Sequence, residues 1–114
     1  MIEGIGIDIV DVNRFKDMPF ETKTSFYKNI FHQNEIEYCL KFKDPYTHFA
    51  GKFAIKEAVI KSINEKESLL RIITDHVNEK PSVVISGKNE YKFIVSISHE
   101  ENYAIGVVVS EKLS

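Results

Sequence analysis

The stretch MIEGIGIDIVDV, residues 1–12, decides how the rest of the chain can pack. Its residues alternate, with Gly4, Gly6 and Asp8 on one face of an extended segment and isoleucines on the other. We therefore predict a β-strand with one apolar face. Because the glycines leave room for another backbone to approach, Asp8 should lie on the side where a second element comes closest.

That second element is predicted from FAGKFAIKEAVIKS, residues 49–62. Asp44 can cap a helix whose first residue is Pro45, and the pattern extends to about residue 63. Residues three and four apart share a helix face, so small alanines lie in line with Glu57. The sequence thus predicts a long helix carrying a carboxylate with open space in front of it.

The remaining elements follow from shorter patterns. We expect a helical turn after Asp11, a helix over 21–31, a helix over 35–42 capped by Asn34, a hairpin of strands 72–77 and 83–86, and strands over 93–98 and 103–110. This order predicts one α+β domain, residues 1–114, with an N-terminal strand, helices including one long helix, and then an antiparallel sheet. The last strand is apolar on both faces, which indicates a covered sheet or a subunit interface.

Composition excludes several classes of function. The formal net charge is −2, from 15 basic and 17 acidic residues, and the chain has no long run of like charges. A broad nucleic-acid-binding surface is therefore not expected. Cys39 is the single cysteine, so no intrachain disulfide forms, which suits a reducing compartment. We find no secretory signal pattern and no apolar run of membrane-spanning length. The expected location is the cytoplasm, away from the membrane.

Asp8 and Glu57 are the candidate metal ligands. Two carboxylates on rigid elements, without a neighbouring His or Cys, suit a hard cation such as Mg²⁺. Two plainer interpretations stay open: Glu57 can pair with Lys61 along the helix, and Asp8 can cap a turn or pair with Arg14.

The lysines of the long helix and the histidines receive different interpretations. Lys52, Lys56 and Lys61 can meet the phosphates of a substrate that the metal holds. His32, His48 and His76 have no partners at metal-ligand spacing, so we expect them to be solvated.

Four stretches together resemble one family. They are GIDIVDVNRF at 6–15, NEIEYC at 34–39, FAGKFAIKEAVIKS at 49–62 and SISHEENYAIGVVV at 96–109. In this order the chain resembles the holo-acyl-carrier-protein synthases, the small class of 4′-phosphopantetheinyl transferases. The resemblance spans nearly the whole chain, and the pair GIDIV and FxxKEAxxK is more specific than either motif alone.

The resemblance implies an activity and its partners. Such an enzyme moves 4′-phosphopantetheine from coenzyme A to a serine of an apo acyl carrier protein and releases adenosine 3′,5′-bisphosphate, a step that serves fatty acid biosynthesis. It implies dependence on Mg²⁺, and a homotrimer with sites at the subunit interfaces.

The resemblance also implies roles for individual residues. Asp8 and Glu57 match the Mg²⁺ ligands, Lys61 the lysine near the reacting phosphate, and Arg14 the arginine that meets the carrier protein. Around coenzyme A it implies roles for four residues: Lys52, Phe53, Ser98 and His99. The group that deprotonates the serine is left open between a metal-held water, Glu57 and Lys61.

Two other functions stay open beside this one. The family usually has a glycine-containing loop after the long helix, whereas this chain reads INEKESLL at 63–70. That departure favours a non-catalytic trimeric relative that binds a carrier protein or nucleotide, although Asp8, Glu57 and Lys61 argue against it. A Mg²⁺-dependent diphosphate hydrolase on the same scaffold is the third possibility.

Overall fold

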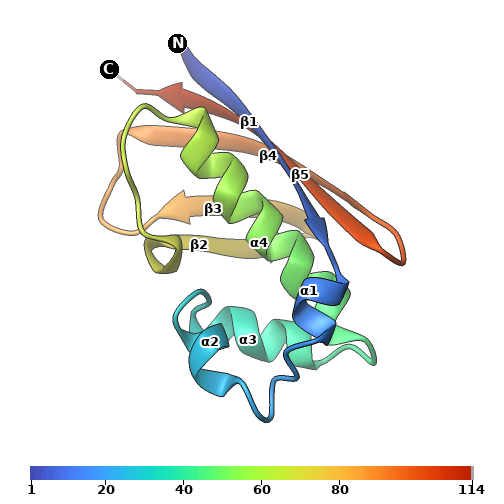
Figure 1. Ribbon diagram of the computed structural model, residues 1–114. Helices are drawn as coiled ribbons and strands as arrows, with labels where there is room; N and C mark the ends of the chain where they lie inside the picture. The colour runs from blue at the N-terminus through green and yellow to red at the C-terminus, as the bar shows by residue number, and fades with distance from the viewer. Residues whose placement is uncertain (114) are drawn as a thin grey trace.

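The fold is described from a computed structural model, in which residues 1–113 are placed (Figure 1). The helical elements are α1 (Asn13–Lys16), α2 (Thr24–Lys28), α3 (Gln33–Leu40), α4 (Pro45–Ser62) and the 3-10 turn η1 (Leu69–Arg71). The strands are β1 (Ile2–Asp11), β2 (Ile72–Val77), β3 (Lys80–Ile85), β4 (Tyr91–His99) and β5 (Tyr103–Lys112). The expected α+β class is confirmed.

The strands form two sheets, where the sequence predicted one run of antiparallel strands. A three-stranded antiparallel sheet has the order β1-β5-β4, so the first strand of the chain pairs with the last. In this register Asp8 lies opposite Gly106. The hairpin β2-β3 forms a separate two-stranded sheet. Figure 1 shows α4 lying between the hairpin and the larger sheet.

Three glycines bring the larger sheet against α4. A Cβ added to Gly6 would lie 1.9 Å from the Ala58 carbonyl oxygen, and one added to Gly4 would lie 2.3 Å from that of Ser62. A Cβ on Gly106 would also meet the α4 backbone, at 2.8 Å. Helix and sheet therefore touch backbone to backbone, which confirms the close approach predicted from the alternating glycines.

The long helix begins as the sequence predicts. The Asp44 side chain accepts a hydrogen bond from the Tyr46 N–H, and Pro45 takes the first helical position. The cap predicted for the preceding helix is wrong: His32, not Asn34, is the N-cap of α3. The reason is Glu35, whose buried carboxylate accepts the His32 backbone N–H at 2.8 Å.

Two other predicted bounds also change. The helix expected over 21–31 is only the five-residue α2, Thr24–Lys28. The hairpin turn is the pair Asn78-Glu79, both with positive φ (52° and 67°), so Pro81 lies within β3. Asn accepts this conformation better than most residues, and no glycine is needed for the turn.

An aromatic core fills the space between α1, α2, α3 and α4. The Tyr27 ring is fully buried, stacks on Phe31 and packs at a tilt against Phe49. Its hydroxyl donates to the Met18 carbonyl at 2.7 Å. Cys39 is buried in the same cluster, and burial raises the pKa of its thiol to about 12. The core thus fixes the lower half of α4.

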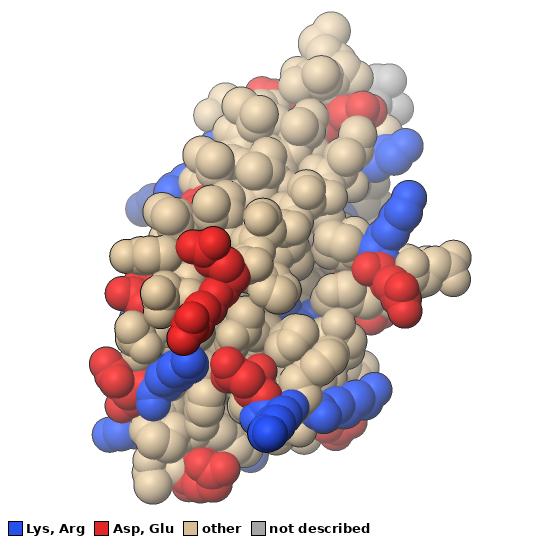
Figure 2. Space-filling model, turned by 90° about the vertical axis from the view of Figure 1, so that its right-hand side faces the viewer, with Lys and Arg blue, Asp and Glu red and all other residues tan. Residues whose placement is uncertain are grey.

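The opposite face of the larger sheet is apolar and open. Ile5, Ile7 and Ile9 of β1 are 68%, 60% and 62% exposed, and Ile94 of β4 is 56% exposed. Figure 2 shows the side on which β1 and β5 lie in Figure 1, where uncharged surface covers most of the upper part. Within residues 1–113, no helix is long and apolar enough to cross a membrane.

Candidate functional site

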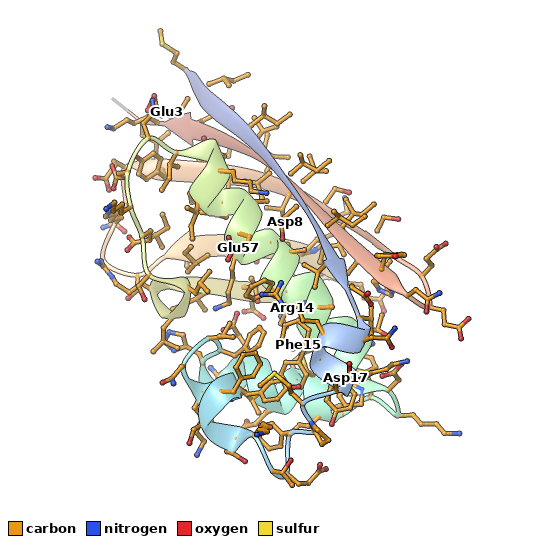
Figure 3. All side chains as sticks on the ribbon, in the orientation of Figure 1. Glu3, Asp8, Arg14, Phe15, Asp17 and Glu57 are labelled. Atoms are coloured by element: carbon orange, nitrogen blue, oxygen red, sulfur yellow. The ribbon has the colours of Figure 1, made fainter. Side chains whose placement is uncertain are left out.

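The glycine contact places Asp8 directly beside α4. Gly6 touches α4 at Ala58, and Gly106, the partner of Asp8 across the sheet, touches it at Ala54. Glu57 lies on the same stretch of helix, and Figure 3 shows Asp8 and Glu57 at neighbouring positions on β1 and α4. Two carboxylates far apart in the sequence thus come from two elements whose backbones are in contact.

Lys61 binds Asp8, not Glu57. Its Nζ lies 3.0 Å from Asp8 Oδ1 and also donates to the Ile7 carbonyl at 3.1 Å. The Asp8 side chain is 17% exposed and that of Lys61 52% exposed. The plainer interpretations, a Glu57–Lys61 pair along the helix and an Asp8–Arg14 pair, are therefore wrong for this structure.

The Glu57 carboxylate has no hydrogen-bond or ion-pair partner among residues 1–113, although it is half-buried. The second oxygen of Asp8 is equally free, since only Oδ1 meets Lys61. Across the same residues no cluster of three or more His, Cys, Asp or Glu side chains could hold a metal. Two carboxylates with open oxygens still fit Mg²⁺, which commonly takes only one or two protein carboxylates and completes its shell with water and phosphate.

Arg14 and Phe53 lie below this pair. The Arg14 guanidinium lies over the Phe53 ring, 4.9 Å from its centroid. Phe53 is 6% exposed and packs edge-on against Phe15 in the aromatic core. Arg14 itself is exposed on α1 and bridges no carboxylate among the described residues, so it is open to a partner from outside (Figure 3).

Lys52 belongs to a different hollow, an open groove of about 1130 Å³ that α3, α4, the hairpin and β4 line. Its side chain runs through the interior, where Nζ donates to Thr74 Oγ1 at 3.0 Å and lies 4.6 Å from the centre of the Tyr38 ring. Burial lowers the pKa of Lys52, and nearby Cys39 and Glu35 oppose that shift. A cation is thus held at the floor of the groove.

Ser98 and His99 lie at the end of β4, at the rim. His99 lines both the large groove and a shallow hollow on the outer face of the sheet, which Ser98 and Ile9 also line. Both Ser98 and His99 are exposed. The predicted coenzyme residues therefore come from two surfaces that meet at His99.

One chain does not bring all predicted site residues together. Lys52 and Glu57 are five residues apart on α4, so their side chains leave the helix about 140° apart. Asp8, Glu57 and Lys61 form one group at the β1–α4 contact, whereas Lys52 and His99 line the groove across the helix.

Lys56 takes no part in either group. Its Nζ lies 2.8 Å from Glu35 Oε1, both side chains are fully buried, and Nζ also donates to the Ile30 and Leu69 carbonyls at 3.0 Å. Burial lowers the pKa of Lys56, and Glu35 opposes that shift. The suggestion that Lys56 meets a substrate phosphate is wrong, because its ammonium is enclosed.

Comparison with known proteins assigns the chain to a family. The sequence model described as the 4′-phosphopantetheinyl transferase superfamily matches residues 4–108, a range that contains Asp8, Glu57 and Lys61. The chain belongs to this superfamily. That assignment confirms the family resemblance noted in the sequence.

Phosphopantetheinyl transferase relatives match along nearly the full chain. A holo-[acyl-carrier-protein] synthase of Thermodesulfovibrio yellowstonii is 42% identical over 112 residues, covering 96% of this chain and 98% of the relative. A second, from Geotalea daltonii, is 34% identical and covers 98% of this chain and 100% of the relative.

Solved structures of superfamily members have the same fold. The holo-(acyl-carrier-protein) synthase of Bacillus anthracis, in complex with CoA (3′,5′-ADP), has a TM-score of 0.85 at 31% identity, covering 100% of this chain and 99% of that one. The Helicobacter pylori enzyme, in complex with coenzyme A, has a TM-score of 0.80 at 32% identity, covering 94% and 99%.

Salt bridges attach the loop after α4 to the segment before β4. Lys88 forms ion pairs with Glu65 and Glu67, and the Tyr91 hydroxyl donates to Glu65 at 2.8 Å. These contacts tie INEKESLL to the segment before β4. The departure from the glycine-containing pattern thus has a structural counterpart, a loop fastened by side chains.

Sequence reasoning missed two histidines of this superfamily member. His48 and His76 were expected to be solvated, but both are half-buried and line the groove beside Lys52. The signal was available: His48 precedes Lys52 by one helical turn, and His76 follows Thr74 on the same face of β2.

Proposed function

We propose that this chain is a holo-[acyl-carrier-protein] synthase, which transfers 4′-phosphopantetheine from coenzyme A to a serine hydroxyl of an apo acyl carrier protein. Adenosine 3′,5′-bisphosphate leaves as the second product. The observation that carries the proposal is the contact of β1 with α4, which gathers Asp8, Glu57 and Lys61 at one place. Membership of the superfamily supports the reaction type.

Mg²⁺ is the proposed metal, with Asp8 and Glu57 as its protein ligands. Both side chains have carboxylate oxygens without a partner within residues 1–113. When bound, the ion would neutralise charge on the pyrophosphate oxygens of coenzyme A.

Lys61 has two tasks in this proposal. Its ammonium holds Asp8 by an ion pair and a hydrogen bond of 3.0 Å, which orients that carboxylate before any substrate arrives. Because its side chain is 52% exposed, the same ammonium can also meet a phosphate oxygen and stabilise the charge that develops there. Glu57, without a protein partner, is a candidate to accept the serine proton, and Lys61 in its neutral form is another.

The complete site is proposed to form between subunits of a homotrimer. Within one chain Lys52 and His99 lie in the groove on the far side of α4 from Glu57. A second copy can supply them, and the exposed isoleucines of β1 offer an apolar surface for such a contact (Figure 2). Phe53 and Ser98 would support the coenzyme site from either side of the interface. Sedimentation velocity at micromolar concentration should give a trimer, and a monomer would contradict this arrangement.

The acyl carrier protein is the proposed protein partner, with Arg14 as its contact. Arg14 is exposed on α1 and lies below Glu57 and Asp8 along α4 in Figure 3. Its guanidinium is held over Phe53 and keeps its hydrogen-bond donors for an acidic surface. Such a reaction would take place in the cytoplasm.

Intact-mass spectrometry tests the reaction. Apo acyl carrier protein, coenzyme A, Mg²⁺ and this chain should give a carrier heavier by one phosphopantetheine, and a chelator should prevent the gain. Glu57→Gln should abolish transfer without loss of the fold by circular dichroism, whereas Glu37→Gln, at an exposed position on α3, should leave it intact. Full activity of Glu57→Gln would remove Glu57 from the site.

Two outcomes lead to the other functions. A folded chain that binds coenzyme A but modifies none of several carriers would be a non-catalytic relative. Cleavage of coenzyme A without any carrier would indicate a diphosphate hydrolase. Both outcomes should be tested because the loop after α4, which Lys88 binds at Glu65 and Glu67, departs from the glycine-containing pattern of the family.

A further inference from the structure

Three histidines from three elements line the groove beside Lys52. They are His48 on α4, His76 on β2 and His99 at the end of β4. The resemblance gives His99 a place near coenzyme A, but the reaction proposed above uses neither His48 nor His76. A groove that gathers three imidazoles around a buried lysine has the composition of an anion site.

Stacking fixes the two unassigned rings. His48 stacks on Phe42, with centroids 3.6 Å apart and planes at 15°, and lies 5.8 Å from the His99 ring. His76 stacks on Tyr38 at 4.6 Å and 12°. Its Nδ1 is buried without a hydrogen-bond partner among residues 1–113. A ring nitrogen that is buried but unpaired is a group for which a ligand can supply the missing partner.

Among the charged residues that line the groove, lysines outnumber carboxylates. Lys52 at the floor, Lys41 after α3 and Lys80 on β3 line it, and the lining carboxylate is that of Glu79 in the hairpin turn. Two further acids lie near the rings: Asp44, the cap of α4, near His48, and Asp75 of β2 near His76. The cations favour an anionic ligand.

The same surroundings favour the neutral form of both rings, because they lower the pKa values of His48 and His76. Burial lowers the pKa of His48, and His99, His76 and Lys52 lower it further, against the opposing effect of Asp44. Burial also lowers the pKa of His76, Lys52 adds to the effect, and Asp75 opposes it. A dianionic phosphate entering the groove would reverse the balance, since an opposite charge nearby favours the protonated imidazole.

We propose that His48 and His76 couple the binding of coenzyme A to proton uptake, through the 3′-phosphate of the coenzyme in this groove. The inference rests on the proposed function, which makes coenzyme A the donor. The two histidines act as specificity residues, because their protonation favours a donor that carries the 3′-phosphate over one that lacks it.

The sign of the effect follows from linkage. A ligand that raises a pKa binds more tightly at low pH. The gain in affinity is complete below the pKa values of the empty groove and disappears as the pH rises through those of the complex. A phosphate monoester loses its second charge near pH 6, so the useful window lies above about pH 6 and below about pH 8.

Isothermal titration calorimetry tests the coupling. Coenzyme A and 3′-dephospho-coenzyme A are titrated into the full chain at about pH 6.3 and pH 8, in two buffers of different ionisation enthalpy. Coenzyme A should bind several-fold more tightly at the lower pH, with net proton uptake, because each unit of pKa shift is worth up to about tenfold in affinity. The dephospho ligand should show neither effect.

Two variants assign the protons. His48→Gln combined with His76→Gln should flatten the pH dependence and reduce the proton uptake, whereas His32→Gln, which lies outside the groove lining, should retain both. NMR titration of the imidazole signals should show the His48 and His76 pKa values rising when coenzyme A binds.

The outcomes separate this inference from the function on which it rests. Transfer to the carrier protein together with unchanged proton uptake in the double variant, or unchanged imidazole pKa values, would overturn the inference alone. No binding of coenzyme A and no transfer would overturn both. Equal proton uptake with the dephospho ligand would also overturn it, because the 3′-phosphate would then play no part.

Discussion

Two lysine–carboxylate pairs on α4 have nearly the same length and different surroundings. Lys56 and Glu35 are 2.8 Å apart with both side chains fully buried, whereas Lys61 and Asp8 are 3.0 Å apart with side chains 52% and 17% exposed. In the first pair every neighbour is protein. In the second pair oxygens are left free for a ligand. Burial, not distance, separates a pair that holds the fold from a pair that can take part in chemistry.

Breaking the buried pair should have the largest effect on stability. Glu35→Gln leaves the Lys56 ammonium without its counter-charge, and such a loss costs about 3–5 kcal/mol of unfolding free energy. Urea unfolding at pH 7 measures it. The double change Glu35→Leu with Lys56→Met should recover most of the loss, because neither member of the pair then carries a charge. A single variant within about 1 kcal/mol of the parent would contradict the comparison.

Widening the contact between β1 and α4 should come next. Gly6→Ala places a Cβ against the Ala58 carbonyl, and overpacking of this kind typically costs about 1–3 kcal/mol. Gly51→Ala is the matched control, since its Cβ would meet only Ile97 at an ordinary 3.6 Å. In the helix interior that control should gain about 0.5–1 kcal/mol. Equal effects of the two changes in urea unfolding would show that the glycine contact is not needed.

Breaking the open pair should scarcely change stability. Asp8→Asn removes a partly exposed ion pair, which is worth about 1 kcal/mol or less. Transfer to the carrier protein should nevertheless fall by about 10²-fold or more, because charge stabilisation at the phosphate is lost. Urea unfolding measures the change in stability, and mass spectrometry of the carrier protein measures the rate of transfer. A small change in the first with a large change in the second is the opposite of what we expect for Glu35→Gln. A large loss of stability would place Asp8 with the buried pair.

The smallest effect should come from the histidines of the groove. The pKa values of His48 and His76 are lowered in the folded chain, so the unfolded chain binds more protons. Stability should therefore decline as the pH falls through about 6.5, the ordinary value for histidine. His48→Gln with His76→Gln should make the thermal midpoint less dependent on pH between about 5 and 8. An unchanged dependence would assign the effect to other groups.

Sequence patterns predicted the elements best where local chemistry decides them. The alternation around Gly4 and Gly6 predicted β1 and its close contact, and Asp44 with Pro45 predicted the start of α4. Sequence patterns failed where a side chain distant in the sequence determines the start of a helix. Asn34 is not the cap of α3, because Glu35 is drawn inward by Lys56, a residue 21 positions further on.

The candidate site divides in the same way. Asp8 and Glu57 were recognisable as an isolated pair of carboxylates, but the sequence offered only Glu57 as a partner of Lys61. The packing of β1 on α4, which no local pattern encodes, brings Asp8 to Lys61 instead. His48 and His76 were missed because stacking on Phe42 and Tyr38 depends on how the end of α3 lies against α4 and the hairpin. No local pattern encodes that arrangement.

The glycine contact has a consequence for how the protein can change. Since β1 and α4 touch through backbone atoms, the spacing between Asp8 and Glu57 does not depend on the size of any side chain between them. The groove, by contrast, is built from side chains of α3, α4 and three strands. Donor preference can therefore be altered by substitution at the groove while the spacing of the two carboxylates stays fixed, which makes the groove the natural place for evolution or engineering to act.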